Sequence, residues 1–306
     1  MEADWKTILI VALLFVGGLG VGYGFSSAVV GPEEQSIKIV GSTTVLPLAE
    51  ECAKNMMNEY AYVTISVSGG GSGTGYSALI NGEADIADAS RTPKQKEIDD
   101  ASDAGVVLNL HTVAIDVLTV VVNTDVATDL KLTMHEIGKI FAGEYDTWGE
   151  VNTTSTIQTP DASIKLVDRE SGSGTRGVFV EICLDPWGLQ VESEGTTVVG
   201  SNQEMAETVK GQSNAIGYVG LAYLKEGLTA VKTRNDSSVD WFNPEDMKET
   251  GNRLSDYPLS RPLYMATDGN LIPGSLTARF IHYVQDSHDT VREIGYFPVS
   301  FSQKVS

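Results

Sequence analysis

Residues 41–44 read Gly-Ser-Thr-Thr and residues 172–175 read Gly-Ser-Gly-Thr, so one short phrase occurs twice. Each copy lies where an apolar, strand-like segment gives way to a helical pattern, and a third run of small residues, 69–75, lies between them. A helix start presents unpaired backbone N–H groups and the positive end of the helix dipole, and glycine lets a ligand approach that backbone closely. Serine and threonine add hydroxyl donors. Three such helix starts predict that several loops together hold one tetrahedral oxyanion.

Length and charge limit the classes of protein to consider. The 306 residues are enough for two lobes, and 42% apolar with 20% charged residues is ordinary for a globular protein. The net charge of −20 argues against a nucleic-acid partner, which would need a basic surface. It would also repel an anion at long range, so an anion site must depend on short-range, preorganised donors.

The cysteines and histidines point to no metal site and no cofactor. Cys52 and Cys183 each lie about ten residues into the helix that follows one copy of the phrase, so we expect buried thiols in two separate lobes and no disulfide between them. The four histidines are scattered, and no cluster has metal-ligand spacing. They are His111, His135, His282 and His288.

Residues 1–35 are expected to be a targeting segment outside the fold. No residue from 7 to 30 is charged, and 8–16 is densely apolar. The run can serve as a signal peptide cleaved after the small residues 26–28, or as a retained membrane anchor. We favour the anchor, which places the rest of the chain on the extracytoplasmic face of the membrane; cleavage would make it a secreted protein.

From residue 36 onward strand and helix patterns alternate, which is typical of an α/β fold. The expected strands are 37–40, 63–67, 85–91, 117–122, 164–167, 216–219 and 259–265; the expected helices are 44–60, 73–81, 134–141, 178–184 and 276–284. We expect the chain to cross into a second lobe at 117–122 and to return near 259–265. This gives one lobe from 36–116 and 265–306 and another from 117–264, with a ligand between them.

Arg169 is the strongest single candidate for contacting an anion. It ends the expected strand four residues before Ser173, and its planar fork matches phosphate or carboxylate oxygens. The alternative is a surface arginine paired with Asp168 or Glu170. Arg91, at the end of its own strand, is equally open to a surface role.

An enzyme is the competing interpretation. Residues 172–177 match the G-x-G-x-x-G dinucleotide fingerprint, and Glu192 and Glu194 lie near the distance expected for a ribose-binding acid. However, residues 168–171 separate the strand from the first glycine and spoil the tight turn. No basic residue is placed to activate the serines, which favours donors over nucleophiles.

Several ordered motifs resemble the periplasmic phosphate-binding proteins of the Pst ABC importer. The similarity extends over essentially all of the chain after residue 36. The motifs are residues 41–47, 71–75, 84–91, 140–143 with Trp148, 169–176, 215–218 and 295–299.

The resemblance implies a monomeric, two-lobed, hinge-closing receptor of the periplasmic-binding-protein fold (type II-like), which binds one phosphate in the interlobe cleft and passes it to permease subunits. By position, the implied phosphate donors are Ser42, Thr43, Thr44 and Ser72 in the first lobe, and Arg169, Ser173, the backbone N–H of Gly174 and Thr175 in the second. The bacterial members usually carry a lipid-modified cysteine near the N-terminus; none occurs here, which favours a peptide anchor.

One position departs from the family pattern. Many members place an aspartate at the end of the third strand to accept the proton of hydrogen phosphate, whereas this chain has Ser90 and Arg91 there and Asp88 two residues earlier. We include Ser90 and Arg91 among the candidate ligands. Receptors for sulfate, molybdate or tungstate therefore stay open as alternatives, as does an anchored phosphate sensor or scavenger without a transporter.

Overall fold

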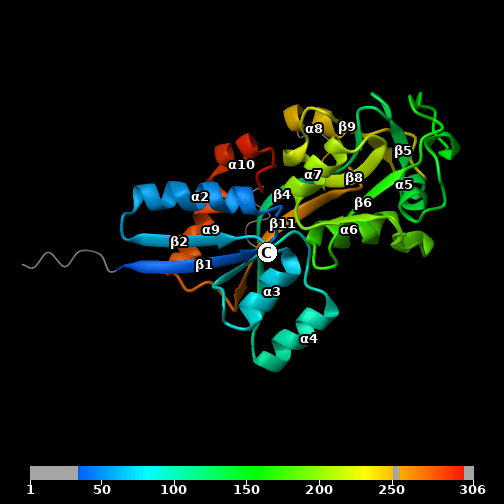
Figure 1. Cartoon of the computed structure of the whole chain (residues 1–306). Helices are drawn as coiled ribbons and strands as arrows, with labels where there is room; N and C mark the ends of the chain where they lie inside the picture. The colour runs from blue at the N-terminus through cyan, green and yellow to red at the C-terminus, as the bar shows by residue number, and fades with distance from the viewer. Residues whose placement is uncertain (1–33, 251–253, 255, 300–306) are drawn as a thin grey trace, which may run out of the picture. The chain divides into compact units, whose positions relative to one another are not determined.

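The computed structural model describes residues 34–250, 254 and 256–299, which form a mixed α/β structure (Figure 1). The strands are β1 (Gln35–Gly41), β2 (Val63–Ser68), β3 (Ile86–Ala89), β4 (Leu108–Asn123), β5 (Lys131–Thr133), β6 (Lys165–Arg169), β7 (Thr197–Val199), β8 (Ala215–Gly220), β9 (Leu228–Ala230), β10 (Lys232–Arg234) and β11 (Ser260–Asp268). The helices are α2 (Leu46–Glu59), α3 (Ser72–Ile80), α4 (Gln95–Ala104), α5 (Met134–Phe141), α6 (Gly174–Cys183), α7 (Asn202–Gly211), α8 (Pro244–Thr250), α9 (Leu276–Asp286) and α10 (His288–Ile294). Short 3₁₀ turns are η1 (Trp148–Glu150), η2 (Asp185–Trp187) and η3 (Leu221–Tyr223).

The main sheet joins two parallel groups of strands through an antiparallel pair. Its order is β2-β1-β3-β11-β4-β8-β6-β7, with β9 beside β4, while β10 and β5 form a separate parallel pair. Strands β2, β1 and β3 are parallel, and so are β8, β6 and β7. Between them, β11 and β4 run antiparallel over nine residue pairs, from Ser260 opposite Val117 to Asp268 opposite Leu108. In Figure 1 these two strands pass between the two groups of elements.

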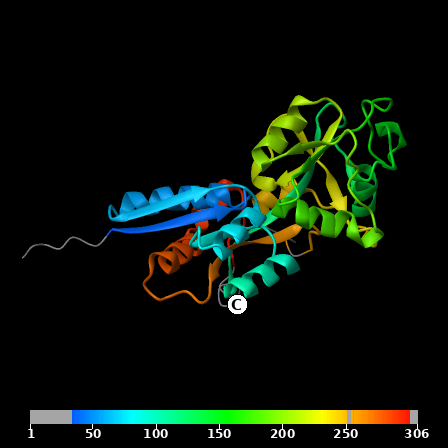
Figure 2. The same ribbon diagram turned by 60° about the horizontal axis from the view of Figure 1, so that its bottom comes forward.

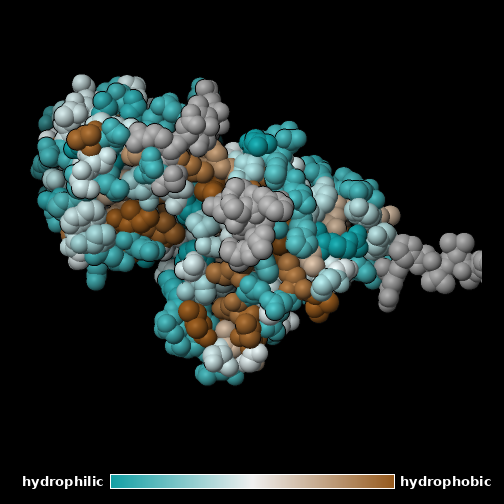
Figure 3. All heavy atoms as spheres, turned by 180° about the vertical axis from the view of Figure 1, so that it is seen from behind, coloured by the Kyte–Doolittle hydropathy of each residue, from teal (hydrophilic) through white to brown (hydrophobic). Residues whose placement is uncertain are grey.

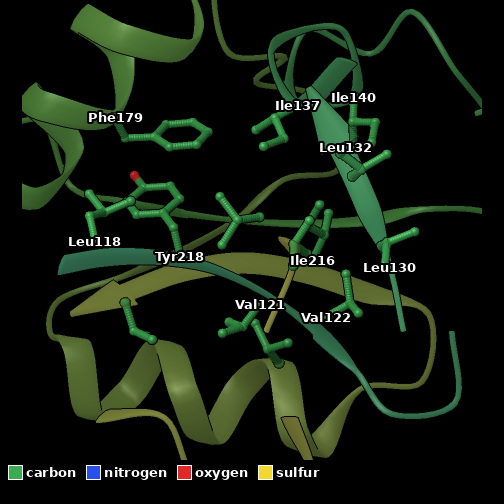
Figure 4. Close-up of a cluster of buried hydrophobic side chains, with 14 of the residues drawn as sticks. Leu118, Val121, Val122, Leu130, Leu132, Ile137, Ile140, Phe179, Ile216 and Tyr218 are labelled. Atoms are coloured by element: carbon green, nitrogen blue, oxygen red, sulfur yellow. The ribbon is translucent and has the colours of Figure 1, made fainter. Parts of the chain in front are cut away.

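The hydrophobic core is divided in the same way. One cluster packs α2 and α9 against β1–β3, and the other packs α5, α6 and α7 against the second half of β4, β6 and β8. Figure 4 shows part of the second cluster, where the rings of Phe179 and Tyr218 stack with centroids 4.1 Å apart. The predicted two-lobed α/β fold is therefore confirmed.

Most predicted elements form within a few residues of the expected bounds. The helix expected over 134–141 is α5, and the return strand expected over 259–265 is β11. Strand β4 is longer than predicted because it continues from one core into the other, with Ala114 in the first cluster and Val117 in the second. Cys52 and Cys183 are buried free thiols, as predicted, and burial raises the pKa of Cys52 to about 11.

The expected targeting segment lies almost entirely outside the described residues. Within the described part of the chain, no helix is both long and apolar enough to cross a membrane. On the face in Figure 3, apolar side chains lie in separate patches between hydrophilic ones.

Local chemistry explains where the helices begin. Pro47 lies in the first turn of α2, where its missing N–H has no intrahelical partner to lose. Gly71 precedes α3 with φ 92° and ψ 159°, a conformation that strongly favours glycine. Ser173 caps α6, since its Oγ accepts a hydrogen bond from the backbone N–H of Arg176 at 3.2 Å. The helix starts of α2, α3 and α6 lie toward the middle of the molecule in both views (Figures 1 and 2).

Candidate functional site

Four helix starts and the ends of three strands converge between the two hydrophobic clusters. The turn after β1 leads into α2, the loop after β2 into α3, and the loop after β6 into α6, while α7 supplies the fourth helix start. The hydroxyl side chains here are all at most 8% exposed: Ser42, Thr43, Thr44, Ser72, Ser90, Ser173 and Thr175. Buried hydroxyl groups need hydrogen-bond partners, so their arrangement decides what the site can bind.

Three serines of the first lobe, Ser42, Ser72 and Ser90, contact one another. Ser42 Oγ donates to Ser90 Oγ at 3.0 Å, and Ser72 Oγ lies 3.4 Å from Ser90 Oγ. The backbone N–H of Ser90 also donates to Ser72 Oγ at 3.1 Å. Three segments distant in sequence thus bring their hydroxyl groups to one point.

The second copy of the phrase lies directly against this group. A Cβ placed on Gly174 would overlap the Oγ atoms of Ser72 and Ser90, so only glycine fits at this helix start. The backbone N–H of Gly73 donates to the carbonyl of Gly172 at 3.1 Å. This backbone hydrogen bond therefore links the two lobes in the described conformation.

The two threonines that end the phrases meet at the centre. Thr44 Oγ1 lies 2.9 Å from Thr175 Oγ1. Thr43 Oγ1 accepts hydrogen bonds from Arg169 Nη2 at 3.3 Å and from Asn202 Nδ2 at 3.4 Å. The threonines of the first phrase are thus bound by side chains of the second cluster.

Arg169 combines a paired and an unpaired side of its guanidinium group. Its Nε and Nη2 donate to the two carboxylate oxygens of Glu170, each at 2.9 Å, so the alternative pairing with Glu170 is present. Its Nη1 is buried and has no hydrogen-bond partner, although the residue is only 1% exposed. An unpaired cationic donor in a buried site is costly, and an anion would satisfy it.

The second candidate arginine, Arg91, is held by an acidic residue. It makes two hydrogen bonds of 2.7 Å to the carboxylate of Glu97, and only its Nε lacks a partner. A neighbouring arginine, Arg176, pairs with Asp168 at 2.8 Å. In the described structure the Arg91 side chain thus donates to Glu97 and to the carbonyl of Thr92, and not to the buried serine and threonine hydroxyls.

Three functional candidates were missed by the sequence analysis. Asn202, at the start of α7, donates from Nδ2 to Thr44 Oγ1 at 2.9 Å. Arg261 of β11 donates from Nη2 to Thr175 Oγ1 at 3.1 Å and to Asp116 Oδ2 of β4 at 2.8 Å. The signals were present, because Asn202 follows another Gly-Ser pair after a strand. Asp116 is the one acidic residue inside β4, and Arg261 is the one basic residue inside β11.

The half-buried Tyr223 and the buried Tyr296 fix the backbone of the first phrase. The hydroxyl of Tyr223 donates to the carbonyl of Thr43 at 2.8 Å, and that of Tyr296 donates to the carbonyl of Thr44. Burial raises the pKa of both hydroxyls, so they stay protonated and remain donors.

Asp88 makes no side-chain hydrogen bond. Both of its carboxylate oxygens are buried without a partner, and burial raises its pKa well above the usual value for aspartate. A buried carboxyl that makes no hydrogen bond to Ser90 does not supply the acceptor that the family resemblance implies near this strand end.

The dinucleotide fingerprint at residues 172–177 does not form a cofactor site in this conformation. Strand β6 ends at Arg169 and helix α6 begins at Gly174, so residues 170–173 lie between them. A dinucleotide site needs the first glycine in a tight turn directly after the strand. The described residues also contain no group of three His, Cys, Asp or Glu side chains placed to hold a metal ion.

Comparison with known proteins identifies the family. A family model described as a PBP superfamily domain matches residues 26–287. A phosphate-binding protein PstS from Staphylococcus saprophyticus is 31% identical over 265 residues, which cover 86% of this chain and 78% of the relative. This chain belongs to the PstS family. A second PstS, from Staphylococcus epidermidis, is 30% identical over 266 residues, covering 85% of this chain and 78% of the relative.

Solved structures similar to this PstS-family chain have the same fold. A phosphate ABC transporter substrate-binding protein from Clostridium perfringens, solved with bound phosphate, superposes with a TM-score of 0.70 at 27% identity and covers 87% of this chain and 100% of its own. An ABC-type phosphate transport receptor from Vibrio cholerae gives 0.64 at 25% identity, with coverage of 86% and 100%. The sequence resemblance to this family is therefore confirmed.

Proposed function

We propose that this chain binds inorganic phosphate between its two lobes and delivers it to the permease of an ABC importer. The PstS relatives and the phosphate-bound neighbour support the ligand and the transporter. The observation that carries the proposal is Arg169 Nη1, a buried cationic donor without a partner, in a site whose hydroxyls come from both clusters. A tetrahedral anion would supply the missing acceptor.

The proposed ligand set follows the arrangement of the site. The phosphate oxygens would accept hydrogen bonds from the hydroxyls, the guanidinium groups and the backbone N–H of α6 in place of the ion's water shell. The residues are Ser42, Thr43, Thr44, Ser72, Ser90, Arg91, Arg169, Ser173, Gly174 and Thr175. Arg91 is the outermost of the set, since Glu97 already occupies most of its donors.

Binding would be coupled to closure of the two lobes. We place their boundaries at 36–116 with 265–306 and at 117–264, because each range carries the buried residues of one hydrophobic cluster, with Leu263 as the exception. Opening would break the Thr44–Thr175 contact and the Gly73–Gly172 backbone bond. Phosphate held by both lobes would stabilise the closed form, which the permease would recognise.

The proposed role is that of a monomeric receptor and not of an enzyme. Ser42 Oγ donates to Ser90 Oγ, and Ser173 Oγ accepts from the N–H of Arg176 in its own helix, so the hydrogen of Ser173 is free to donate to an anion. Sulfate is the nearest competitor as a ligand. Competition titrations at two pH values separate the two ions, because hydrogen phosphate carries a proton near neutrality and sulfate does not. A phosphate receptor retains its preference at both.

The uncharged run 7–30 would keep this receptor on the extracytoplasmic face of the membrane as an N-terminal anchor. Membrane fractionation of the full chain tests this. Release of the protein into the soluble fraction would indicate a cleaved signal.

Isothermal titration calorimetry with phosphate tests the function and the role of Arg169 together. Arg169→Ala should weaken binding well over tenfold, which is more than about 1.4 kcal/mol, since it removes a charge-assisted donor. Arg279→Ala on α9 is the matched control, because Arg279 contacts Gln35 and the rings of Tyr60 and Tyr62 instead of the site. Unchanged affinity of Arg169→Ala would remove Arg169 from the site.

A further inference from the structure

Two opposite charges are buried where the chain passes from one hydrophobic cluster to the other. Arg261 of β11 is 3% exposed and Asp116 of β4 is fully buried, and the two residues are register partners. Arg261 donates to Asp116 Oδ2 from Nη2 at 2.8 Å and from Nε at 3.1 Å. A buried ion pair contributes little net stability, because desolvation offsets most of the attraction. Its position therefore calls for another explanation.

The guanidinium of Arg261 reaches both copies of the phrase. Besides Asp116, its Nη2 lies 3.1 Å from Thr175 Oγ1 and 3.3 Å from Thr44 Oγ1. Of the two Nη2 hydrogens, one is directed to Asp116 and the other is shared between the two threonine oxygens. Its Nη1 is buried without a partner, as is Asp116 Oδ1. The pair is thus tied to the anion site and is not fully satisfied by the protein.

These contacts fix the direction in which the threonine hydroxyls donate. Thr44 Oγ1 has two accepting positions, and Asn202 Nδ2 at 2.9 Å and Arg261 Nη2 supply donors for both. Its own hydrogen then points to Thr175 Oγ1, 2.9 Å away. Thr175 accepts from Thr44 and from Arg261, so its hydrogen is left for another acceptor.

We propose that Arg261, held by Asp116, is a positioning residue that makes the Thr175 hydroxyl a hydrogen-bond donor toward the bound anion, with Thr44 donating to Thr175. It links these hydroxyls to β4 and β11, the strands that join the two lobes. The inference rests on the proposed phosphate function. Without Arg261, the Thr175 hydroxyl is free to turn its lone pairs toward the anion, and that turn weakens binding.

A double-mutant cycle measured with phosphate by calorimetry tests the proposal. Arg261→Gln combined with Asp116→Asn removes both charges and leaves no lone buried ion. We expect this pair to weaken phosphate binding about tenfold in the wild-type background. In a Thr175→Val background, the same pair should weaken it less than about threefold, because the hydroxyl it positions is gone.

The outcomes separate this inference from the proposed function. If the wild-type chain binds no phosphate, the proposed function fails and this inference with it. If the wild type binds and the pair changes affinity equally in both backgrounds, or not at all, only this inference is overturned. Arg279→Gln should change affinity in neither background. Should the pair fail to fold by denaturant titration, Arg261→Lys keeps a cation beside Asp116 and carries the same comparison, with an equal loss in both backgrounds again contradicting the proposal.

Discussion

The turn from β1 into α2 and the turn from β6 into α6 carry nearly the same four residues and use them differently. In the first turn, Ser42 donates to Ser90 of the same lobe, and Thr43 accepts from Arg169 of the other lobe. In the second turn, the Oγ of Ser173 accepts from the N–H of Arg176 and so stabilises its own helix. The first turn directs the Thr43 side chain to the second lobe, whereas the second turn brings the backbone of Gly174 against the serines of the first lobe.

This difference explains why the second copy contains glycine where the first has threonine. At Gly174 the chain is in van der Waals contact with the serines of the first cluster, so any side chain would be in the way. At Thr43, the equivalent position, the side chain reaches out to Arg169 and Asn202. Similar phrases therefore predict a shared ligand, whereas packing decides which atoms of each phrase face it.

Gly174→Ala should have the largest effect on binding. The added Cβ overlaps Ser72 and Ser90 Oγ and holds the two clusters apart, so we expect phosphate affinity to fall more than about 100-fold, which corresponds to about 2.7 kcal/mol. Gly172→Ala is the matched control, because a Cβ there meets no atom within 4 Å. Calorimetry of both variants decides the matter; equal affinities would show that the tight contact at α6 is not needed for binding.

Removing the two hydroxyls that meet at the centre compares the turns directly. Thr44→Val and Thr175→Val each delete one hydroxyl while keeping its shape, and we expect affinity losses of about tenfold for each. The two losses should not add in the double variant, since the hydroxyls contact each other. Additive losses, measured by calorimetry on all four proteins, would contradict a shared hydroxyl network.

The serines of the two turns should contribute differently to the free energy of unfolding. Ser173→Ala removes the N-cap of α6 and should lower the free energy of unfolding by about 1 kcal/mol. Ser42→Ala removes an oxygen that accepts from the N–H of Thr44 at 3.2 Å but caps no helix end, since α2 has no side-chain cap. Its effect on unfolding without phosphate should be smaller, because no helix end loses its cap. Urea denaturation of both variants measures this, and an equal loss would remove the distinction between the turns.

Asp88, beneath the first turn, should make stability depend on pH. Its carbonyl accepts from the N–H of Ser42 at 2.8 Å, while burial raises the pKa of its carboxyl. The folded state then keeps a proton that the unfolded state has lost, so the stability that this group contributes is present at low pH. That contribution is lost as pH rises from about 4 toward the raised pKa, by up to about 1.4 kcal/mol per pH unit. Relative to Asp88→Asn, the wild type should lose stability over this range in urea titrations; parallel pH profiles would show that Asp88 is not held neutral.

The sequence predicted the local parts of the site and missed those that depend on long-range pairing. The strand-to-helix turns and their hydroxyls could be read locally, because small residues at a helix start have few structural alternatives. Arg261 and Asp116 lie 145 residues apart, and only the register of β11 against β4 brings them together. Arg91 pairs with Glu97, six residues later, and the sequence alone left its surface role open.

A crystal structure of the protein with phosphate tests the central claim most directly. We predict one ion whose oxygens accept hydrogen bonds from Thr43 or Thr44 of the first lobe and from Arg169 and the α6 start of the second. Density for the ion on one lobe alone, or at a site away from both turns, would contradict the account.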